Sequence, residues 1–138
     1  MNLTTSDEDK NMSQQFDTGT RPFAASAAIT QFARVKVESA GTVVTAGLTE
    51  VGDGIAQTAA FASGDVISVK MWNSGGTFKM IAKEALAAAS TLYTEAAGKV
   101  QDTAEATSFP FAKALEAATA GNDIIECALL HYGGVAAS

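Results

Sequence analysis

The sequence repeats itself at a fixed spacing, and this constrains the fold more than any other feature does. One constant offset, without a gap, lays Ala56, Ala59, Ala60, Ala62, Asp65 and Ile67 on Ala114, Ala117, Ala118, Ala120, Asp123 and Ile125. Further upstream the offset changes by one residue, so that residues 38–43 lie on residues 95–100. Two copies are too few for a solenoid, which needs about three repeats. We therefore expect an all-β fold, a small barrel or sandwich built from two pseudo-repeated multi-strand halves that close on each other.

Alternating apolar and polar residues mark strands in both halves. Residues 65–72 alternate in this way, so the strand has one buried and one exposed face. The repeat then predicts the matching buried positions of the second half, and pairs Ile67, Val69 and Met71 with Ile125, Cys127 and Leu129. Residues 29–37 form an earlier half-exposed strand, whose expected buried positions are Val35 and Val37 and whose expected exposed positions are Arg34, Lys36 and Glu38.

The connections are predicted from turn-forming and helix-forming residues. Gly75 and Gly76 supply the backbone freedom of a tight loop, so we expect a hairpin between residues 65–72 and residues 77–82. Residues 83–90 have high helix propensity and are expected to form a turn or two of helix. Residues 91–94 and 99–101 form a second hairpin, and residues 120–123 form the turn before the last strand.

The chain divides into an arm and one domain. Residues 1–22 are polar and acidic and form an N-terminal arm that is flexible or ordered only by a partner. Residues 23–138 form a single β-barrel domain, with pseudo-repeats at about residues 33–72 and 91–130. Arg21, Pro22 and Phe23 end the arm and are the first rigid and apolar residues after the polar run, so they are candidate contacts to a partner.

Composition excludes several functions. The net charge is −6 and the pI is about 4.6, which disfavours direct contact with nucleic acid, because phosphate binding depends on clustered Lys and Arg. No apolar run approaches the roughly 20 residues of a membrane helix, so no membrane partner is expected. One cysteine and one histidine leave no recognisable catalytic, cofactor or metal constellation. Cys127 is expected to be a core residue, and we expect no enzyme and no cofactor.

Two aromatic residues remain open to two interpretations. Trp72 and Tyr93 are candidate anchors of a capsid or subunit interface, since aromatic side chains dominate such contacts. They are equally consistent with structural residues that cap the two ends of a small barrel.

A family resemblance is carried by the last strands. Residues 111–118, the turn Gly121-Asn122-Asp123, the strand of residues 124–130 and the hairpin of residues 92–100 resemble the small capsid decoration, or cement, proteins of tailed bacteriophages. These are compact β-barrel proteins. The resemblance implies a homotrimer that is made in the host cytoplasm, sits on the outer surface of an icosahedral capsid and clamps neighbouring major capsid protein subunits.

Two other classes of function stay open. An exposed aromatic cluster around Trp72 and Tyr93 would indicate a carbohydrate-binding or cell-surface-binding β module. A pocket with convergent titratable groups would indicate a small hydrolase or isomerase.

Overall fold

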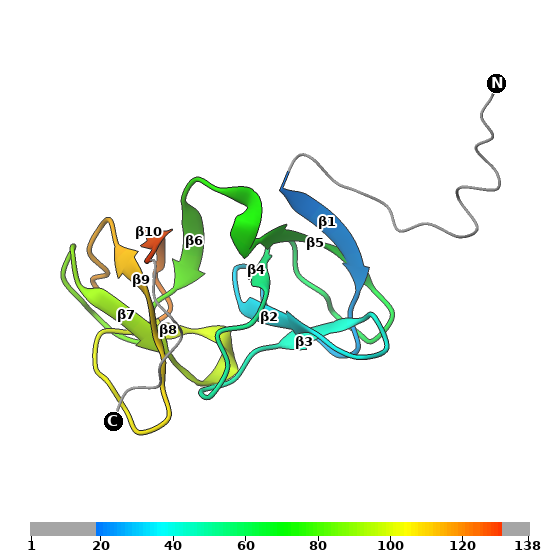
Figure 1. Ribbon diagram of the computed structural model, residues 1–138, viewed down its shortest axis with the longest axis horizontal. Helices are drawn as coiled ribbons and strands as arrows, with labels where there is room; N and C mark the ends of the chain where they lie inside the picture. The colour runs from blue at the N-terminus through cyan, green and yellow to red at the C-terminus, as the bar shows by residue number, and fades with distance from the viewer. Residues whose placement is uncertain (1–18, 131–138) are drawn as a thin grey trace.

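The computed structural model describes residues 19–130, which fold into two five-stranded antiparallel sheets (Figure 1). The first sheet contains β1 (Thr20–Ala24), β2 (Arg34–Val37), β3 (Val43–Thr45), β4 (Gly54–Ala56) and β5 (Val66–Met71). The second contains β6 (Phe78–Ile81), β7 (Thr91–Thr94), β8 (Val100–Gln101), β9 (Pro110–Ala114) and β10 (Ile124–Leu129). Two short 3-10 helices, η1 (Trp72–Ser74) and η2 (Ala96–Gly98), complete the elements. The predicted all-β fold is confirmed.

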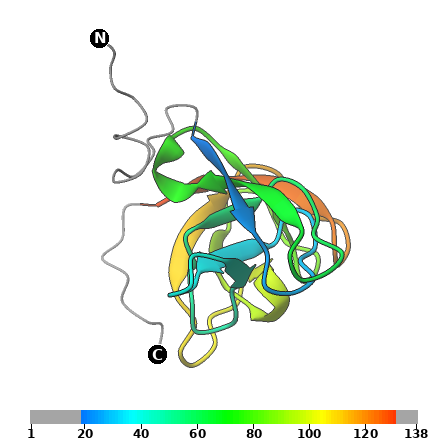
Figure 2. The ribbon, with the colours of Figure 1, turned by 90° about the vertical axis from the view of Figure 1, so that its right-hand side faces the viewer.

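The two sheets have the same strand order. The first runs β1-β5-β4-β2-β3 and the second runs β6-β10-β9-β7-β8, which is the same order advanced by five strands. Each sheet curls until its ends meet, because Ala25 forms a parallel bridge with Val43 and Ala82 forms the same bridge with Val100 (Figure 2). The predicted pseudo-repetition of two halves is therefore present in the hydrogen-bonded topology.

The repeat is longer than the pattern of identical residues indicated. Strands β1 to β3 match β6 to β8 at one constant offset, and β4 and β5 match β9 and β10 at an offset one residue longer. The extra residue of the second half thus falls between β8 and β9. The first strand of each half, which the sequence comparison did not include, belongs to the repeat. In the first half that strand begins at Thr20, so Arg21 and Pro22 lie in β1; residues 1–18 of the predicted arm lie outside the described residues.

Asp65 and Asp123 occupy matching positions because each closes the same kind of turn. Each carboxylate accepts two main-chain N–H groups in the turn before the last strand of its half, from Phe61 and Ala62 in the first and from Thr119 and Ala120 in the second. An aspartate that bonds its own backbone in this way holds a turn closed. The matching turns deliver β5 and β10 into their sheets in the same register.

Each half has its own apolar core, and the two cores exchange residues. Ile81 of the second half packs in the first core, Ile55 of the first half packs in the second, and Phe32 packs against both. The buried positions predicted for the last strands are found: Ile67 and Val69 are buried, as are Ile125 and Cys127. Met71 and Leu129 are half-buried at the strand ends.

Two predicted connections are wrong. Strands β5 and β6 do not form a hairpin, because β5 pairs with β1 and β4 while β6 pairs with β10. The two glycines instead lie in the link between the halves. Residues 83–90 are not helical: Leu86 forms a bridge with Ala118, and Ala89 has a left-handed φ of 71°. The pairing of this alanine-rich segment with the opposite loop overrides its helix propensity.

Arg34 is the largest departure from the predicted pattern, because its side chain is fully buried instead of exposed. Its guanidinium donates to five main-chain carbonyls. Three belong to the β3–β4 loop and two to the β7–β8 hairpin, and the acceptors are Gly47, Glu50, Val51, Glu95 and Lys99. An arginine has five N–H donors, so the set is complete. The side chain joins the first half to the second.

The β7–β8 hairpin also approaches β2 closely. Gly98 has a φ of 72°, and a Cβ at this position would lie 2.8 Å from the Cβ of Ala33 and 3.0 Å from the amide of Arg34. Its counterpart Gly41 has open space at the same point. Gly98 therefore allows the contact between the halves as well as the turn.

Replacement of Arg34 should destabilise the protein more than replacement of any exposed cation. Arg34→Met leaves five carbonyls without their donor, so we expect a loss of about 3 kcal/mol or more in the free energy of unfolding; Arg34→Lys should lose about 2 kcal/mol, since an ammonium cannot reach both loops. Lys36→Met is the control and should lose under about 1 kcal/mol. Urea denaturation measures all three, and equal losses at positions 34 and 36 would contradict the role assigned to Arg34.

Cys127 should tolerate the residue found at its counterpart. Cys127→Val places in β10 the side chain that Val69 supplies in β5, so we expect a change below about 1 kcal/mol. Cys127→Asp buries an unpaired charge and should cost several kcal/mol, on the order of 3 or more. Thermal denaturation of both variants, with Val69→Cys as the reciprocal control, checks the equivalence of the two strands.

Asp123 should make the stability depend on pH. Its pKa is lowered by hydrogen bonds from the Thr119 amide and hydroxyl and from the Ala120 amide. A lowered pKa in the folded state means that the carboxylate stabilises the fold above its unfolded pKa and that this contribution is lost as the pH falls through the folded value. The melting temperature of the Asp123→Asn variant should therefore fall less between pH 6 and pH 3 than that of the unchanged protein. If the melting temperatures of the two proteins fall equally with pH, this role of Asp123 is refuted.

Candidate functional site

The five predicted contact residues do not form one surface. Arg21 and Pro22 are exposed on β1, but Phe23 is only 6% exposed and belongs to the first core. The guanidinium carbon of Arg21 lies 4.5 Å from the centre of the Phe23 ring. Trp72 is half-buried in η1, and Tyr93 is half-buried in β7 of the second sheet. Only Arg21 and Pro22 keep the exposure expected of a docking residue.

Trp72 is a joint between the halves. Its ring centre lies 5.0 Å from that of Phe78, edge to face, and 5.8 Å from that of Phe111, and its Nε1 donates to the carbonyl of Gly52 at 2.8 Å. Gly52 belongs to the first half and both phenylalanines to the second. The half-buried indole thus packs against the core of the second half and is hydrogen-bonded to the first.

An exposed apolar face lies on β1 and β5 instead. Pro22, Ala24 and Val66 share the outward side of this strand pair, and Val66 is 69% exposed. The turn after β4 adds Phe61, which is 86% exposed although the Asp65 carboxylate holds its main-chain amide at 2.8 Å. We call these four residues the β1–β5 face. An exposed aromatic ring on a hydrogen-bonded turn is the kind of residue that anchors protein interfaces.

Sequence reasoning missed Phe61, although a signal was present. The matching position of the second half is Thr119, a polar residue suited to an exposed turn. The repeat thus shows that the turn itself does not require an aromatic residue at this position.

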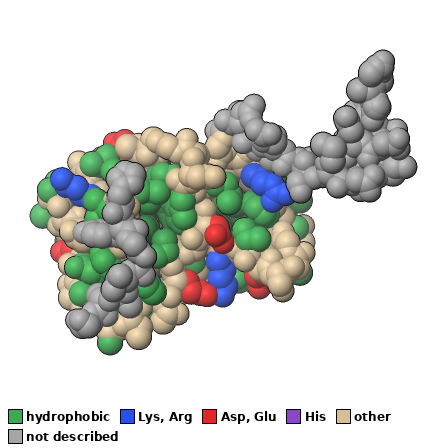
Figure 3. All heavy atoms as spheres, viewed as in Figure 1, with side chains coloured by type: hydrophobic (Ala, Val, Ile, Leu, Met, Phe, Trp, Pro, Cys, Tyr) green, Lys and Arg blue, Asp and Glu red, His purple; other side chains and the backbone are tan. Residues whose placement is uncertain are grey.

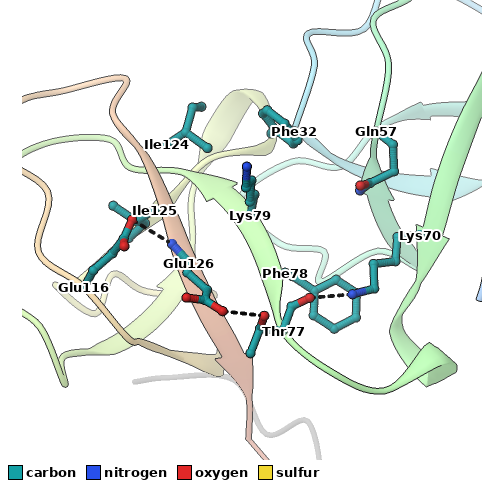
Figure 4. Close-up of a pocket in the computed structure, with 10 residues that line it drawn as sticks. All are labelled: Phe32, Gln57, Lys70, Thr77, Phe78, Lys79, Glu116, Ile124, Ile125 and Glu126. Carbon is teal, nitrogen blue, oxygen red and sulfur yellow. Dashed lines mark hydrogen bonds between the residues drawn. The ribbon is translucent and has the colours of Figure 1, made fainter.

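A groove of about 740 Å³ lies between the two halves (Figure 4). One wall comes from the first half through Phe32, Gln57 and Lys70. The other comes from β6, β10 and the loop after β9, with lining residues Thr77, Phe78, Lys79, Glu116, Ile124, Ile125 and Glu126. The Lys79 side chain points into the space between Phe32 and Ile124.

Most polar groups of the groove are bonded to each other. The Lys70 ammonium lies 4.4 Å from the centre of the Phe78 ring and donates to the carbonyl of Thr77. The Thr77 hydroxyl donates to Glu126 at 2.6 Å, and the Glu126 amide donates to the Glu116 carboxylate at 3.3 Å. The groove thus presents two cations and two carboxylates, with exposed apolar surface at Phe32 and Ile124.

The titratable groups do not indicate acid–base or thiol chemistry. Burial lowers the pKa of Arg34 to about 10, while the negative charges of Glu50 and Glu95 act to raise it. The guanidinium therefore stays protonated at neutral pH. Burial raises the pKa of the Cys127 thiol to about 12, with smaller contributions from Glu116 and Glu126. A thiol in that state is not a nucleophile.

Charged side chains are mixed on the visible face. Acidic and basic groups alternate over β2 and β3 (Figure 3), where the Lys36 ammonium pairs with the Glu50 carboxylate. Between residues 19 and 130, no cluster of His, Cys, Asp and Glu is able to hold a metal ion. The same part of the chain contains no helix long and apolar enough to cross a membrane.

Comparison with known proteins finds a likeness to solved structures. No family model matches the chain, and no curated protein matches it. Among solved structures, the head fiber gp8.5 N base of bacteriophage phi29 is similar, with a TM-score of 0.67 over 80% of this chain and 92% of that one, at 17% sequence identity. The likeness shows a shared fold. It covers strands of both halves, because the matched share of the chain exceeds the length of either half.

Proposed function

We propose that this protein is a structural protein of a bacteriophage virion, and not an enzyme. The observation that carries the proposal is the fold shared with the head fiber base of phi29 along nearly the whole length of that protein. The likeness of the last strands to capsid decoration proteins points in the same direction and was drawn from the sequence independently of the structure.

The more specific proposal is decoration of the outer capsid surface. The protein binds as a homotrimer and clamps neighbouring subunits of the major capsid protein. The exposed apolar β1–β5 face supports this role, because its exposed apolar side chains and aromatic ring are able to bury area against a second protein. The contact residues of the proposal are therefore Pro22, Ala24, Val66 and Phe61, with Arg21 on the other side of β1 and Tyr93 on the second half as separate candidates.

A carbohydrate-binding module is not favoured by the structure. Its distinguishing feature was an exposed aromatic cluster around Trp72 and Tyr93, but both residues are half-buried and the indole of Trp72 packs on Phe78 and Phe111.

The stabilising mechanism is mass action. A protein that binds the assembled shell but not its dissociated subunits shifts the equilibrium toward the intact particle. Each copy needs to contribute only a few kcal/mol, because many copies bind one shell. A free concentration of about 100 times the Kd gives a stabilisation of about 2.7 kcal/mol per site.

Binding to capsids should depend on Phe61. The purified protein should co-sediment with expanded capsids that lack it and raise their rupture temperature, and Phe61→Ser should lower its affinity at least tenfold, an alanine-scan effect of about 1.4 kcal/mol. Thr119→Ala changes the matching turn of the second half and is the control, with unchanged affinity. Both variants should keep the melting temperature of the parent within a few degrees.

Two outcomes separate the parts of this proposal. No co-sedimentation of the parent protein at micromolar concentration would refute the decoration role. Normal co-sedimentation of Phe61→Ser would keep the role and remove the β1–β5 face from it. Sedimentation equilibrium of the free protein tests the trimer separately.

A further inference from the structure

The two halves begin with matching edge strands that differ at one position. Strands β1 and β6 each lie at the end of their sheet. In the repeat, Pro22 of β1 corresponds to Lys79 of β6, and their partners Ser68 and Glu126 also correspond. Proline has no N–H and is confined to edge strands or bulges. The free side of β1 therefore lacks a donor at its centre, whereas the free side of β6 keeps one.

Hydrogen bonds determine which way the Lys79 main chain points. The Glu126 carbonyl accepts from the Leu115 amide at 2.9 Å, and the Glu126 amide donates to Glu116, so both main-chain groups of Glu126 face away from β6. The pair Lys79–Glu126 is thus of the non-hydrogen-bonded type, in which both residues direct their N–H and C=O outward. On that side of β6, Val100 of β8 bridges Ala82 just beyond the end of the strand, and within residues 19–130 no strand pairs with Lys79 itself.

The free side of β6 opens into the groove between the halves. The Lys79 ammonium lies 5.8 Å from the centre of the Phe32 ring on the opposite wall, and Ile124 is 41% exposed beside it (Figure 4). A space of about 740 Å³ lies within the range of pockets that enclose a ligand of several hundred daltons. The site therefore combines an open strand edge with exposed apolar surface on Phe32 and Ile124, and both features favour an added strand.

The N-terminal segment of the chain joins β1 at the mouth of this groove. The Gly19 carbonyl accepts from the Met71 amide at 3.0 Å, and Thr20 lies opposite Lys70, one of the lining residues. Gly19 bends the backbone, with a φ of 84°, and a Cβ there would lie 2.3 Å from the Cβ of Ser74. The start of β1 and η1 are side by side in both views (Figures 1 and 2).

The length and the sequence of residues 1–18 suit the groove. The 18 residues before Gly19 span up to roughly 60 Å when extended, far more than the four residues of β6. Met12, Gln14 and Phe16 fall on one side of an extended chain, because side chains alternate. Met12 and Phe16 are the apolar residues on that side. The segment runs toward the groove mouth and β6 leads away from it, so the two directions are antiparallel.

We propose that residues 12–16 of this chain lie in the groove as an antiparallel strand added to β6, paired with the main chain of Lys79. The added strand covers an open edge that would otherwise be available for pairing with other chains. The first half needs no such cover, since Pro22 closes β1. The docking does not depend on the proposed role at the capsid.

Hydrogen exchange tests the docking directly. The Lys79 amide should exchange at least tenfold more slowly in the full chain than in a variant lacking residues 1–18, and a synthetic peptide of residues 1–18 should restore the slow rate when added to that variant. Equal exchange of the Lys79 amide in the full and shortened chains would overturn the proposal.

A proline substitution gives the matched control that the repeat provides. Lys79→Pro removes only the outward N–H and copies the residue at the corresponding position of β1, so the fold should be kept. Chymotrypsin should cut after Phe16 at least fivefold faster in Lys79→Pro than in Lys79→Ala, which keeps the amide and removes the ammonium. Equal cleavage of the two variants and the parent would contradict strand addition.

A cross-link shows whose segment is bound. A variant that combines Cys127→Val, Gln14→Cys and Gln57→Cys is treated with a short bismaleimide. The cross-linked protein should run as a single chain on a denaturing gel. Cross-linked dimers would overturn docking within one chain and assign the groove to the segment of a neighbouring copy.

Discussion

The buried guanidinium of Arg34 determines how the two halves are joined. It is fully buried and has no carboxylate among its hydrogen-bond partners; five main-chain carbonyls from two loops surround it. Burying a charge is costly unless it is hydrogen-bonded, and here every N–H of the side chain is directed at an acceptor. The loops must therefore adopt one arrangement. Since one loop belongs to each half, the geometry of a single side chain sets the geometry of the junction.

Other contacts depend on that junction. The close approach of Gly98 to Ala33 holds the same hairpin against β2, and the hydroxyl of Thr94 donates to the carbonyl of Leu48 across the halves. Trp72 closes the opposite side by packing on Phe78 and Phe111. The groove is the remaining space between these fixed contacts, which explains why it has rigid walls from both halves.

The repeat made most of the fold predictable. Matching positions such as Val69 and Cys127 identify the core without knowledge of strand pairing, and Asp65 and Asp123 mark the same turn twice. Arg34 was missed because alternation alone assigned it to the exposed face of β2, and its partners are backbone carbonyls, which leave no trace in a sequence. Residues 83–90 were predicted to be helical because local propensity ignores the bridge between Leu86 and Ala118. The site was less predictable than the fold: Phe23 and Trp72 are apolar enough to serve equally in a core or an interface, and burial separates the two only in three dimensions.

The turns at Phe61 and Thr119 show what fusion of two copies permits. A symmetric homodimer displays every surface residue twice, since both subunits share one sequence. Joining the copies in one polypeptide removes that constraint, so a change in one copy leaves the other as it was. The two turns keep the same aspartate and the same backbone, yet one displays an aromatic ring and the other a hydroxyl. The chain is in this sense a heterodimer with a fixed one-to-one composition, in which two versions of a single module, one with an exposed aromatic ring and one without, are always made in equal number.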